Sequence, residues 1–463
     1  MVPSQPKIDP KDINKEYPYL SNVKAPPQLL GLSPLLNPLA DHVSAQRLNM
    51  YSQHLPQAQI LAGAEMPRLL SGYEGIVGEY EHDPTERDKD VQIMAVIPRF
   101  VESFGASPIY GNPYDTVIYR EVSGDPKEYR VGYFNVPKDA VRSDGYGYEY
   151  KKLPTCRQLS EGNFIPKDMK FITSPAHSGP NGERYMLGTN LNVCYIDVPE
   201  VTEDAFVISE SAAKKLGTKG YGVKSFKILP NQIPLGLYSS ETEYKFLPDI
   251  GEQVRDDGIL CALRTPSETS VVFDTLTSNL HQVQHLHDRI TYVPAGATIV
   301  DIDVVVNRKV KVSTPEFIFT QVEKYRKPIS QYCKRVYETY KTAVNEGLHP
   351  TPEFNTLVTR CLASALIDGE PVDGLNNRLK KLKAARKKEL VEFIYITVTY
   401  KYDKPMSLGH KLTNRSGGKG TCSRIVPDSM MPVDQNGIRA EVLGAAVSIF
   451  NRMDSCIQLA IAV

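Results

Sequence analysis

The sequence predicts an α+β fold in which strands predominate, and three observations support this class. Apolar and polar residues alternate over 393–402 and again over 293–306, which is typical of strands with one buried face. Prolines and glycines are plentiful, at 34 and 31, which favours short elements joined by loops over a helical bundle. Helices are expected at the two copies of Thr-Pro-Glu-Phe, 314–317 and 351–354, because each sets a threonine N-cap before a proline at the first helical position.

Composition limits the classes of function. A chain of 463 residues is long enough for two to four domains with cores of their own. Lys+Arg and Asp+Glu both number 54, so any surface for nucleic acid must be a local patch. No run approaches the ~18 apolar residues that span a bilayer, and the first residues form no apolar signal region. Seven cysteines without a C-x-x-C pair predict reduced thiols in the cytosol and no zinc module.

The stretch 405–424 carries the clearest chemistry, and we expect it to form a loop between strands. Its cations are Lys411, Arg415, Lys419 and Arg424, and its glycines are Gly409, Gly417, Gly418 and Gly420. Glycine lets the backbone approach a ligand closely, and lysine suits phosphate, so an anionic partner is indicated. A nucleotide-binding P-loop is excluded, because Thr413 and Gly420 stand where that motif needs a glycine and a Ser/Thr. An ordinary glycine-rich surface loop is the alternative.

An acidic pair, Glu203-Asp204, is the second candidate. It lies between a strand at 191–195 and a strand at 205–208 that leads into a helix capped by Ser209 or Ser211. Because adjacent carboxylates point in different directions, at most one of them is expected to bind a metal ion directly. A solvated acidic turn is the alternative.

The remaining stretches are less informative. Residues 38–50 predict a capped helix before a turn at Pro56, which an amphipathic surface helix would explain. The His-rich run 281–288 has no partner motif, so a metal site there is disfavoured. Residues 74–150 predict short strands with many tyrosines and indicate no chemistry. A basic amphipathic helix over 375–390 either binds nucleic acid or an acidic partner, or is simply solvated.

The run G-H-K-L-T-N-R-S-G-G-K-G, 409–420, resembles the G-D-K-x-x-x-R-H-G-x-K-G block of the second-largest (β) subunit of multisubunit RNA polymerases. The matching positions are Gly409, Lys411, Arg415, Gly417, Lys419 and Gly420, while His410 and Ser416 depart from the pattern.

Three further blocks resemble the family, and all four occur along the chain in the same order as in the family. Residues 38–50 resemble its fork segment, P-F-x-x-H-D-x-x-x-R-x-x-M, with Arg47 nine residues after Pro38. Residues 188–211 resemble L-G-x-N…F-E-D-A-I-x-I-S-E, with Thr202 in place of the phenylalanine. Residues 431–453 resemble M-P…D-G…S-R-M without the intervening N-P-L-G-V-P.

The resemblance implies a double-psi β-barrel that binds the RNA–DNA hybrid, with an inserted flap-like domain of strands and helices. The implied division is 1–73 for a fork-like segment and proline-rich lead-in, 74–150 for a β-rich connection, 151–285 and 391–463 for the two parts of the barrel, and 286–390 for the flap-like domain.

The resemblance also implies roles for individual residues in two-metal phosphoryl transfer. Lys411 and Lys419 would lie at the RNA 3′ end, and Arg47 and Arg452 would bind the NTP phosphates. Nucleic acid would be bound by Gln57, Arg415 and Arg424. Asp204, and less directly Glu203, would lie near the second Mg²⁺.

The family keeps its N-A-D-F-D-G-D cluster, which holds the first Mg²⁺, on the β′-type subunit, and this chain has none. We therefore expect it to be inactive alone. The chain also lacks the front half of β and stops shortly after the R-M motif, so the resemblance implies the C-terminal part of a split β subunit, as in giant tailed phages, with a truncated β subunit as the alternative. Its partners would be an N-terminal β fragment, a β′-type subunit, a promoter-specificity factor, template DNA, the RNA transcript and NTPs. It would act in the cytoplasm of an infected bacterium or be packaged in the virion.

Two alternatives belong to other classes. One is a non-catalytic β-barrel scaffold that binds nucleic acid. The other is a stand-alone hydrolase that depends on carboxylates or histidines, and no nucleophile motif supports it.

Overall fold

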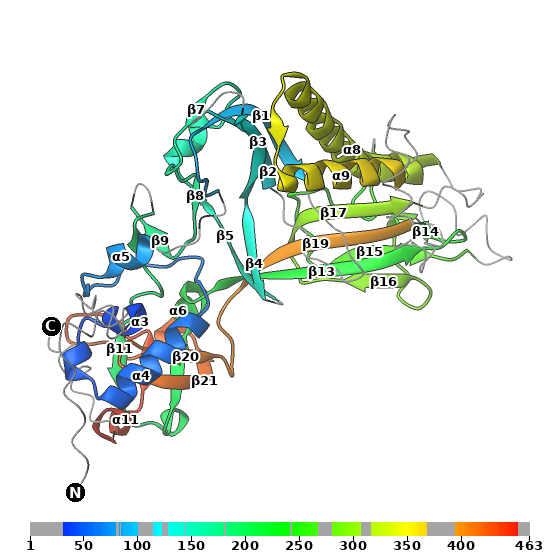
Figure 1. The fold of residues 1–463 in the computed structure, drawn as a ribbon. Coiled ribbons are helices and arrows are strands. Elements are labelled where there is room, and N and C mark those ends of the chain that lie inside the picture. The colour runs from blue at the N-terminus through cyan, green and yellow to red at the C-terminus, as the bar shows by residue number, and fades with distance from the viewer. Residues whose placement is uncertain are drawn as a thin grey trace, which may run out of the picture. The chain divides into compact units, whose positions relative to one another are not determined.

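The computed structural model describes residues 31–79, 83, 85–100, 114–122, 128–143, 145–179, 182–240, 243–266, 280–306, 316–367 and 394–451. The chain divides into two compact units, each assembled from segments that are far apart in the sequence (Figure 1). The first unit comprises 1–81, 176–217 and 405–463, and the second comprises 82–175 and 218–404.

The second unit contains most of the strands. Its elements are β1 Val91–Phe100, β2 Tyr114–Glu121, β3 Arg130–Pro137, β4 Asp139–Ser143, β5 Tyr146–Glu149, β6 Lys151–Lys152, η4 Pro154–Gln158, β7 Phe164–Ile165, β8 Ile172–Thr173, β13 Thr218–Ile228, β14 Ile233–Pro234, β15 Ile259–Arg264, β16 Arg289–Tyr292, β17 Thr298–Val306, α8 Glu316–Asn345, β18 His349–Pro350, α9 Pro352–Ile367 and β19 Ile394–Lys404.

The long strand β19 is the centre of one five-stranded sheet, of order β17-β19-β13-β5-β4. It pairs antiparallel with β17 on one side and with all eleven residues of β13 on the other. Its alternating residues Ile394, Ile396 and Val398 are fully buried. The strand predicted over 393–402 is therefore confirmed, and its apolar face explains why it forms.

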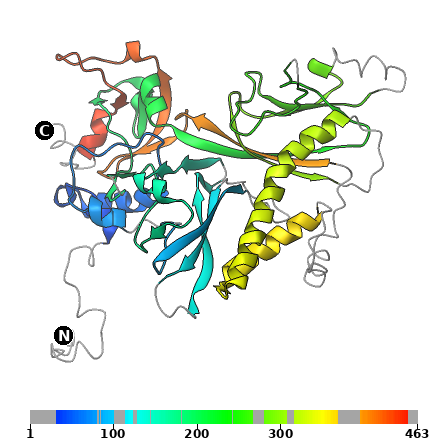
Figure 2. The same ribbon diagram turned by 90° about the horizontal axis from the view of Figure 1, so that it is seen from above.

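A second five-stranded sheet, of order β18-β3-β2-β1-β7, supports the two long helices. Apolar residues of its strands and of α8 and α9 share one core, in which Ile118, Val131, Val336 and Phe354 are buried. Figure 2 shows the two helices, in yellow, side by side. Thr351 caps α9 as predicted, since its Oγ1 accepts the Phe354 N–H at 3.3 Å.

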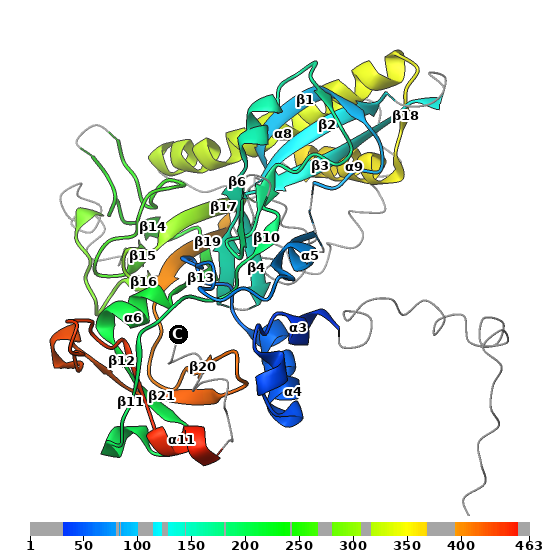
Figure 3. The same ribbon diagram turned by 90° about the vertical axis from the view of Figure 1, so that its left-hand side faces the viewer.

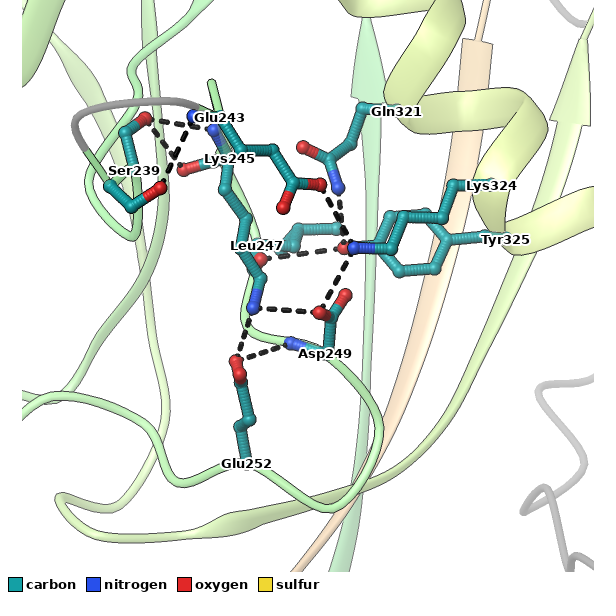
Figure 4. A network of polar contacts seen from close by, with 10 residues as sticks. Ser239, Glu243, Lys245, Leu247, Asp249, Glu252, Gln321, Lys324 and Tyr325 are labelled. Atoms are coloured by element: carbon teal, nitrogen blue, oxygen red, sulfur yellow. Dashed lines mark hydrogen bonds and ion pairs between the residues drawn. The ribbon is translucent and has the colours of Figure 1, made fainter.

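A polar network fastens the start of α8 to the loop that precedes β15 (Figure 4). The Lys245 ammonium donates to Asp249 at 2.8 Å and to Glu252 at 2.5 Å. Lys324 of α8 donates to Asp249 and Glu243, at 3.1 and 3.0 Å. The Tyr325 hydroxyl donates to the Leu247 carbonyl at 3.4 Å, so the loop is held along one face of the helix.

The first unit is smaller and mixes short helices with short strands. Its elements are α3 Leu32–Leu35, η1 Ala40–His42, α4 Ala45–His54, η2 Leu55–Gln57, α5 Glu74–Glu79, β9 His177–Ser178, β10 Arg184–Tyr185, β11 Val193–Tyr195, η5 Pro199–Val201, β12 Ala205–Ser209, α6 Glu210–Lys215, β20 Lys411–Thr413, β21 Lys419–Val426, η7 Asp428–Met430, β22 Val442–Gly444 and α11 Ala446–Asn451.

A five-stranded sheet of order β11-β22-β12-β21-β20 organises this unit. The central strand β12 runs parallel to β21 and antiparallel to β22. Phe206 and Ile208 of β12 pack with Cys422 of β21 and Ala212 of α6 in one buried cluster. The Ser209 side chain accepts the Ala212 N–H at 3.2 Å, which confirms the predicted cap.

The predicted α+β, strand-rich class is thus confirmed. None of the sheets formed by the described strands closes into a barrel, and the double-psi β-barrel stays a prediction. The five-domain division also stays a prediction. The helix expected over 375–390 lies outside the described residues. In the described part of the chain, no helix is long and apolar enough to cross a membrane.

Candidate functional site

The lysine-rich stretch forms a hairpin, whereas the sequence had indicated a loop. Strands β20 and β21 pair antiparallel, with Lys411 opposite Thr421 and Thr413 opposite Lys419. Directly paired residues share a face of a hairpin, as do residues two apart on one strand. Lys411 and Lys419 therefore lie on the same face, and both side chains are exposed.

The opposite face of the hairpin is the one that packs. Leu412 contacts the buried cluster of the unit, and Cys422 is 2% exposed within it. Gly420 lies between these two positions without a side chain. The strands escaped sequence-based prediction because one face carries cations and the other includes a glycine, which leaves little apolar alternation.

A closed turn joins the two strands over 414–418. Asn414 accepts the Gly418 N–H through its side chain at 2.8 Å and donates its own N–H to the Gly418 carbonyl at 2.9 Å. Gly417 has φ +74°, a conformation that glycine adopts without strain. Arg415 of the same turn donates to the Leu69 carbonyl at 2.6 Å.

Helix α4 packs against this turn (Figures 1 and 3). Its N-cap is Ser44, whose hydroxyl accepts the Arg47 N–H at 3.4 Å. Arg47, Tyr51 and His54 are spaced by four and three residues, so they share one face of the helix. Tyr51 is buried, and a Cβ on Gly417 would collide with the Arg47 carbonyl oxygen.

Two side chains of that helix face reach the hairpin. The Arg47 guanidinium lies 3.5 Å from the Gly417 carbonyl oxygen, and the His54 Nδ1 lies 3.2 Å from Thr413 Oγ1. Lys419 is the cross-strand partner of Thr413, which His54 contacts. Burial, Lys419 and Arg47 together lower the pKa of His54. The structure thus brings Arg47 and Lys419 into one site, although they are 372 positions apart in the chain. Gln57 is exposed at the end of η2.

The acidic pair lies directly beside β21. The Asp204 carbonyl accepts the Thr421 N–H at 2.9 Å, next to the parallel pair Ala205 and Thr421. A Cβ on Gly420 would come within 2.5 Å of that carbonyl oxygen, so only glycine fits there. Glu203 has φ 56° and is the one non-glycine residue with positive φ among the residues that the structure describes. Such a backbone persists only where surrounding contacts hold it.

The backbone of the acidic pair therefore lies beside β21, the strand that carries Lys419. Within the described ranges, no three His, Cys, Asp or Glu side chains gather in a way that could hold a metal ion. The pair Glu203 and Asp204 offers hard oxygen ligands of the kind that Mg²⁺ prefers, and this ion commonly takes only one or two carboxylates and keeps several waters.

The two remaining predicted cations are Arg424 and Arg452. Arg424 is half-exposed and forms an ion pair with Glu200, with Nη1 and Oε1 2.9 Å apart. It follows a register shift in the pairing of β21 with β12, which leaves Ser423 and Arg424 both exposed. Arg452 lies outside the described residues, and its role stays a prediction.

The His-rich run of the second unit has a structural explanation. Asp288 is buried and accepts two hydrogen bonds from the Arg264 guanidinium, at 2.9 and 2.8 Å. It also accepts the Gln284 N–H at 2.7 Å. His281 Nδ1 lies 2.9 Å from the Gly236 carbonyl oxygen. The acid of the run therefore holds its own turn in place.

A network of polar contacts that the sequence did not reveal joins the segments of the first unit. We call its members Glu65, Asn190 and Lys215 the brace. Lys215 of α6 donates to the Asn190 carbonyl at 2.7 Å and pairs with Glu65 at 3.2 Å. Hydrogen bonds from the Asn190 N–H and from Lys215 outweigh burial and hold the pKa of Glu65 at about 2. Glu441 accepts the Asn192 N–H at 2.8 Å. These contacts fix the segment after α4 to the central sheet.

Comparison with known proteins identifies a family for most of this chain. Residues 167–457 match the model of the family described as RNA polymerase Rpb2, domain 6. The chain belongs to this RNA polymerase Rpb2 domain 6 family. The matched residues include the acidic pair and the whole hairpin, whereas Arg47 and Gln57 precede them.

Relatives with curated descriptions agree with the Rpb2 domain 6 assignment. The chain is 22% identical over 498 residues to the DNA-directed RNA polymerase subunit beta of Rickettsia peacockii (strain Rustic) and to that of Rickettsia akari (strain Hartford). The subunit beta of Rickettsia typhi (strain ATCC VR-144 / Wilmington) is 22% identical over 502 residues. These alignments cover 93% of this chain and 34% of each relative, so the chain spans about a third of their length.

Proposed function

We propose that the chain is the β-subunit region of a multisubunit DNA-dependent RNA polymerase that supplies cations to the active centre and binds the RNA–DNA hybrid. One observation carries this proposal. Three segments that are far apart in the sequence bring Arg47, the two hairpin lysines and the acidic pair into one compact unit of a chain in the Rpb2 domain 6 family.

The cations would neutralise charge that develops during phosphoryl transfer. Lys411 and Lys419 share the exposed hairpin face, where two ammonium groups can hold the RNA 3′ end as point charges. Arg47 would bind the NTP phosphates together with Arg452, because a guanidinium suits bidentate phosphate contacts.

Three further residues would bind nucleic acid. Gln57 is exposed, and Arg415 and Arg424 each use part of their guanidinium for the Leu69 carbonyl and for Glu200. An arginine carries five N–H donors, so Arg424 retains donors for phosphate beside its contact with Glu200.

Mg²⁺ is part of this proposal. Asp204 and Glu203 would contribute oxygens to the second ion, and a β′-type partner would mainly hold the first. The ions, when bound, would orient the attacking and leaving oxygens and offset their charge. The chain alone would then be inactive. Its own contribution is to hold the backbone of the acidic pair beside β21 through the Asp204–Thr421 contact.

The assembly belongs to the proposal as well. Partners would be an N-terminal β fragment, a β′-type subunit and a promoter-specificity factor, as in the split β subunits of giant tailed phages. The complex would act in an infected bacterium or be carried in the virion. Purification of the complex from its native source, with identification of the large polypeptides in it, tests this composition.

RNA extension on a primed RNA–DNA scaffold tests the active-centre role. In the complex that contains this chain, Lys419→Ala is expected to slow nucleotide addition by roughly 10²- to 10³-fold, because one charged contact to a transition state is lost. Subunit composition should not change. Lys214→Ala, at an exposed lysine of α6 in the same unit, is the matched control and should extend RNA normally.

The opposite result has a clear meaning. If Lys419→Ala weakens scaffold binding while extension at saturation is unchanged, the active-centre role is wrong, and the chain is a nucleic-acid-binding scaffold.

A further inference from the structure

His54 is placed at the site by the fold and by none of the motifs. It ends α4, two turns after Arg47, and its Nδ1 lies 3.2 Å from Thr413 Oγ1 on the hairpin. The Thr413 hydroxyl also lies 2.9 Å from the Gly418 carbonyl, to which it must be the donor. A hydroxyl has a single hydrogen. Thr413 therefore accepts from His54, and Nδ1 carries the proton of the imidazole.

This hydrogen bond fixes where a second proton can go. With Nδ1–H engaged by Thr413, the unprotonated nitrogen of the neutral ring is Nε2. Protonation at Nε2 adds a positive charge and a donor without breaking the contact between helix and hairpin. The imidazolium can form while α4 and the hairpin keep their positions.

Burial and the nearby cations lower the pKa of the His54 imidazole and so disfavour its protonation in the protein without ligand. Arg47 of α4 and Lys419 of β21 are the charged groups of the described residues that act on it, and both oppose its protonation, as does its burial. An anion bound between Arg47 and Lys419 would instead raise the pKa of His54. Its negative charge would offset both cations and favour the positively charged imidazolium.

We propose that His54 is a further phosphate-binding residue of the site, neutral when no anion is bound and protonated at Nε2 when a phosphate group binds between Arg47 and Lys419. The proton comes from solvent. This proposal rests on the proposed function, which brings phosphate groups to those two cations.

The test follows the His54 ring by NMR in the full-length chain, with tripolyphosphate as the probe and His54→Gln to assign its signal. Saturation with tripolyphosphate should raise the pKa of His54 by at least about one unit, equivalent to a tenfold preference of the ligand for the imidazolium form. The free chain should show the Nδ1–H tautomer. A His54 titration that is unaffected by tripolyphosphate, or an Nε2–H tautomer, would overturn the proposal.

Binding measurements supply an independent readout. His54→Gln should weaken tripolyphosphate binding by about tenfold at pH 6, where the wild-type imidazole is charged in the complex, and very little at pH 8.5. Equal weakening at both pH values would contradict the proposal. Thr413→Val removes the acceptor of Nδ1–H and should allow both tautomers in the free chain. A tautomer ratio unchanged by this substitution would contradict the assignment.

Two further variants separate this proposal from the proposed function. Suppose that Lys419→Ala and Arg47→Ala each abolish tripolyphosphate binding, while tripolyphosphate leaves the pKa of His54 in the wild-type chain unchanged. The His54 proposal alone is then wrong. If tripolyphosphate binds equally well to both variants, or does not bind to the chain at all, phosphate is not held between these cations and both proposals lose that basis.

Discussion

Gly420 determines how closely the backbone of the acidic pair approaches the hairpin. Its missing side chain leaves room for the Asp204 carbonyl, which a Cβ would approach to 2.5 Å, and for the ring of Phe206. The neighbouring atoms are backbone and a buried aromatic ring, so neither can move aside cheaply.

Gly420→Ala is therefore expected to displace the acidic turn. Overpacking of this kind costs about 1 to 3 kcal/mol of unfolding free energy, and RNA extension by the complex should fall together with it. Gly63→Ala is the control, because a Cβ there meets nothing within 4 Å and the residue has an ordinary φ. Urea unfolding of the two variants measures the difference. A Gly420→Ala protein as stable as Gly63→Ala would show that the turn tolerates the methyl group.

Single residues also show what could be predicted from the sequence. The motifs picked out Lys411, Lys419 and Arg47 because their types recur at fixed spacings, and the structure places all three at one hairpin. His54 could not be found in this way, since it belongs to no motif. Its only sequence signal is its spacing of seven from Arg47 and three from Tyr51, which places it on the same helix face.

At the scale of elements, the brace at Glu65 joins the segment after α4 to α6 and the sheet. The pKa of Glu65 in the folded chain is about 2, compared with 4.5 for a free glutamate side chain. A depressed folded-state pKa stabilises the fold above the unfolded value, and the stabilisation is lost as the pH falls from about 4.5 towards 2.

Glu65→Gln should therefore lower the unfolding free energy at pH 7 by about 1 kcal/mol, a modest value because the Glu65 side chain is 39% exposed and solvent screens the pair. Near pH 3 the difference from wild type should shrink. Glu338→Gln, at an exposed position of α8, provides the comparison. Urea unfolding at several pH values is the measurement, and a penalty that stays constant with pH would be evidence against an ionised Glu65 in the brace.

Elements differ in how well local sequence predicts them. Strands β17 and β19 and the caps of α6 and α9 were predicted because alternation and capping are local signals. The packing of α8 and α9 on β1–β3 was not predicted, since residues such as Ile118 and Phe354 are apolar in either arrangement. The packing of a helix on a sheet depends on which apolar faces meet. Hydrophobic periodicity shows that an element has an apolar face, but it does not show which other face that one contacts.

At the scale of the whole molecule, equal numbers of acids and bases mean that binding to nucleic acid depends on a few local cations. If the proposed function is right, affinity for an RNA–DNA scaffold should fall with salt at a slope set by those contacts.

Lys411→Ala should reduce this slope by about 0.7 to 0.9, because one phosphate contact and its released counterion are lost. Lys214→Ala should leave it unchanged. Titrations of the complex with a labelled scaffold between low and moderate salt measure both slopes. A Lys411→Ala slope equal to that of wild type would mean that this lysine contacts no phosphate.

The discontinuity of the first unit has a consequence for its synthesis. In the folded unit, Ala205 of β12 pairs with Thr421 of β21, and Phe206 pairs with Gly444 of β22. Strand β12 precedes both partners by about 200 residues, so it leaves the ribosome long before them. Phe206 and Ile208 must wait for their partners while the whole segment 218–404 is translated. The nascent chain therefore carries its acidic turn without the hairpin while 218–404 is translated, and Asp204 can bond to Thr421 only when the hairpin emerges.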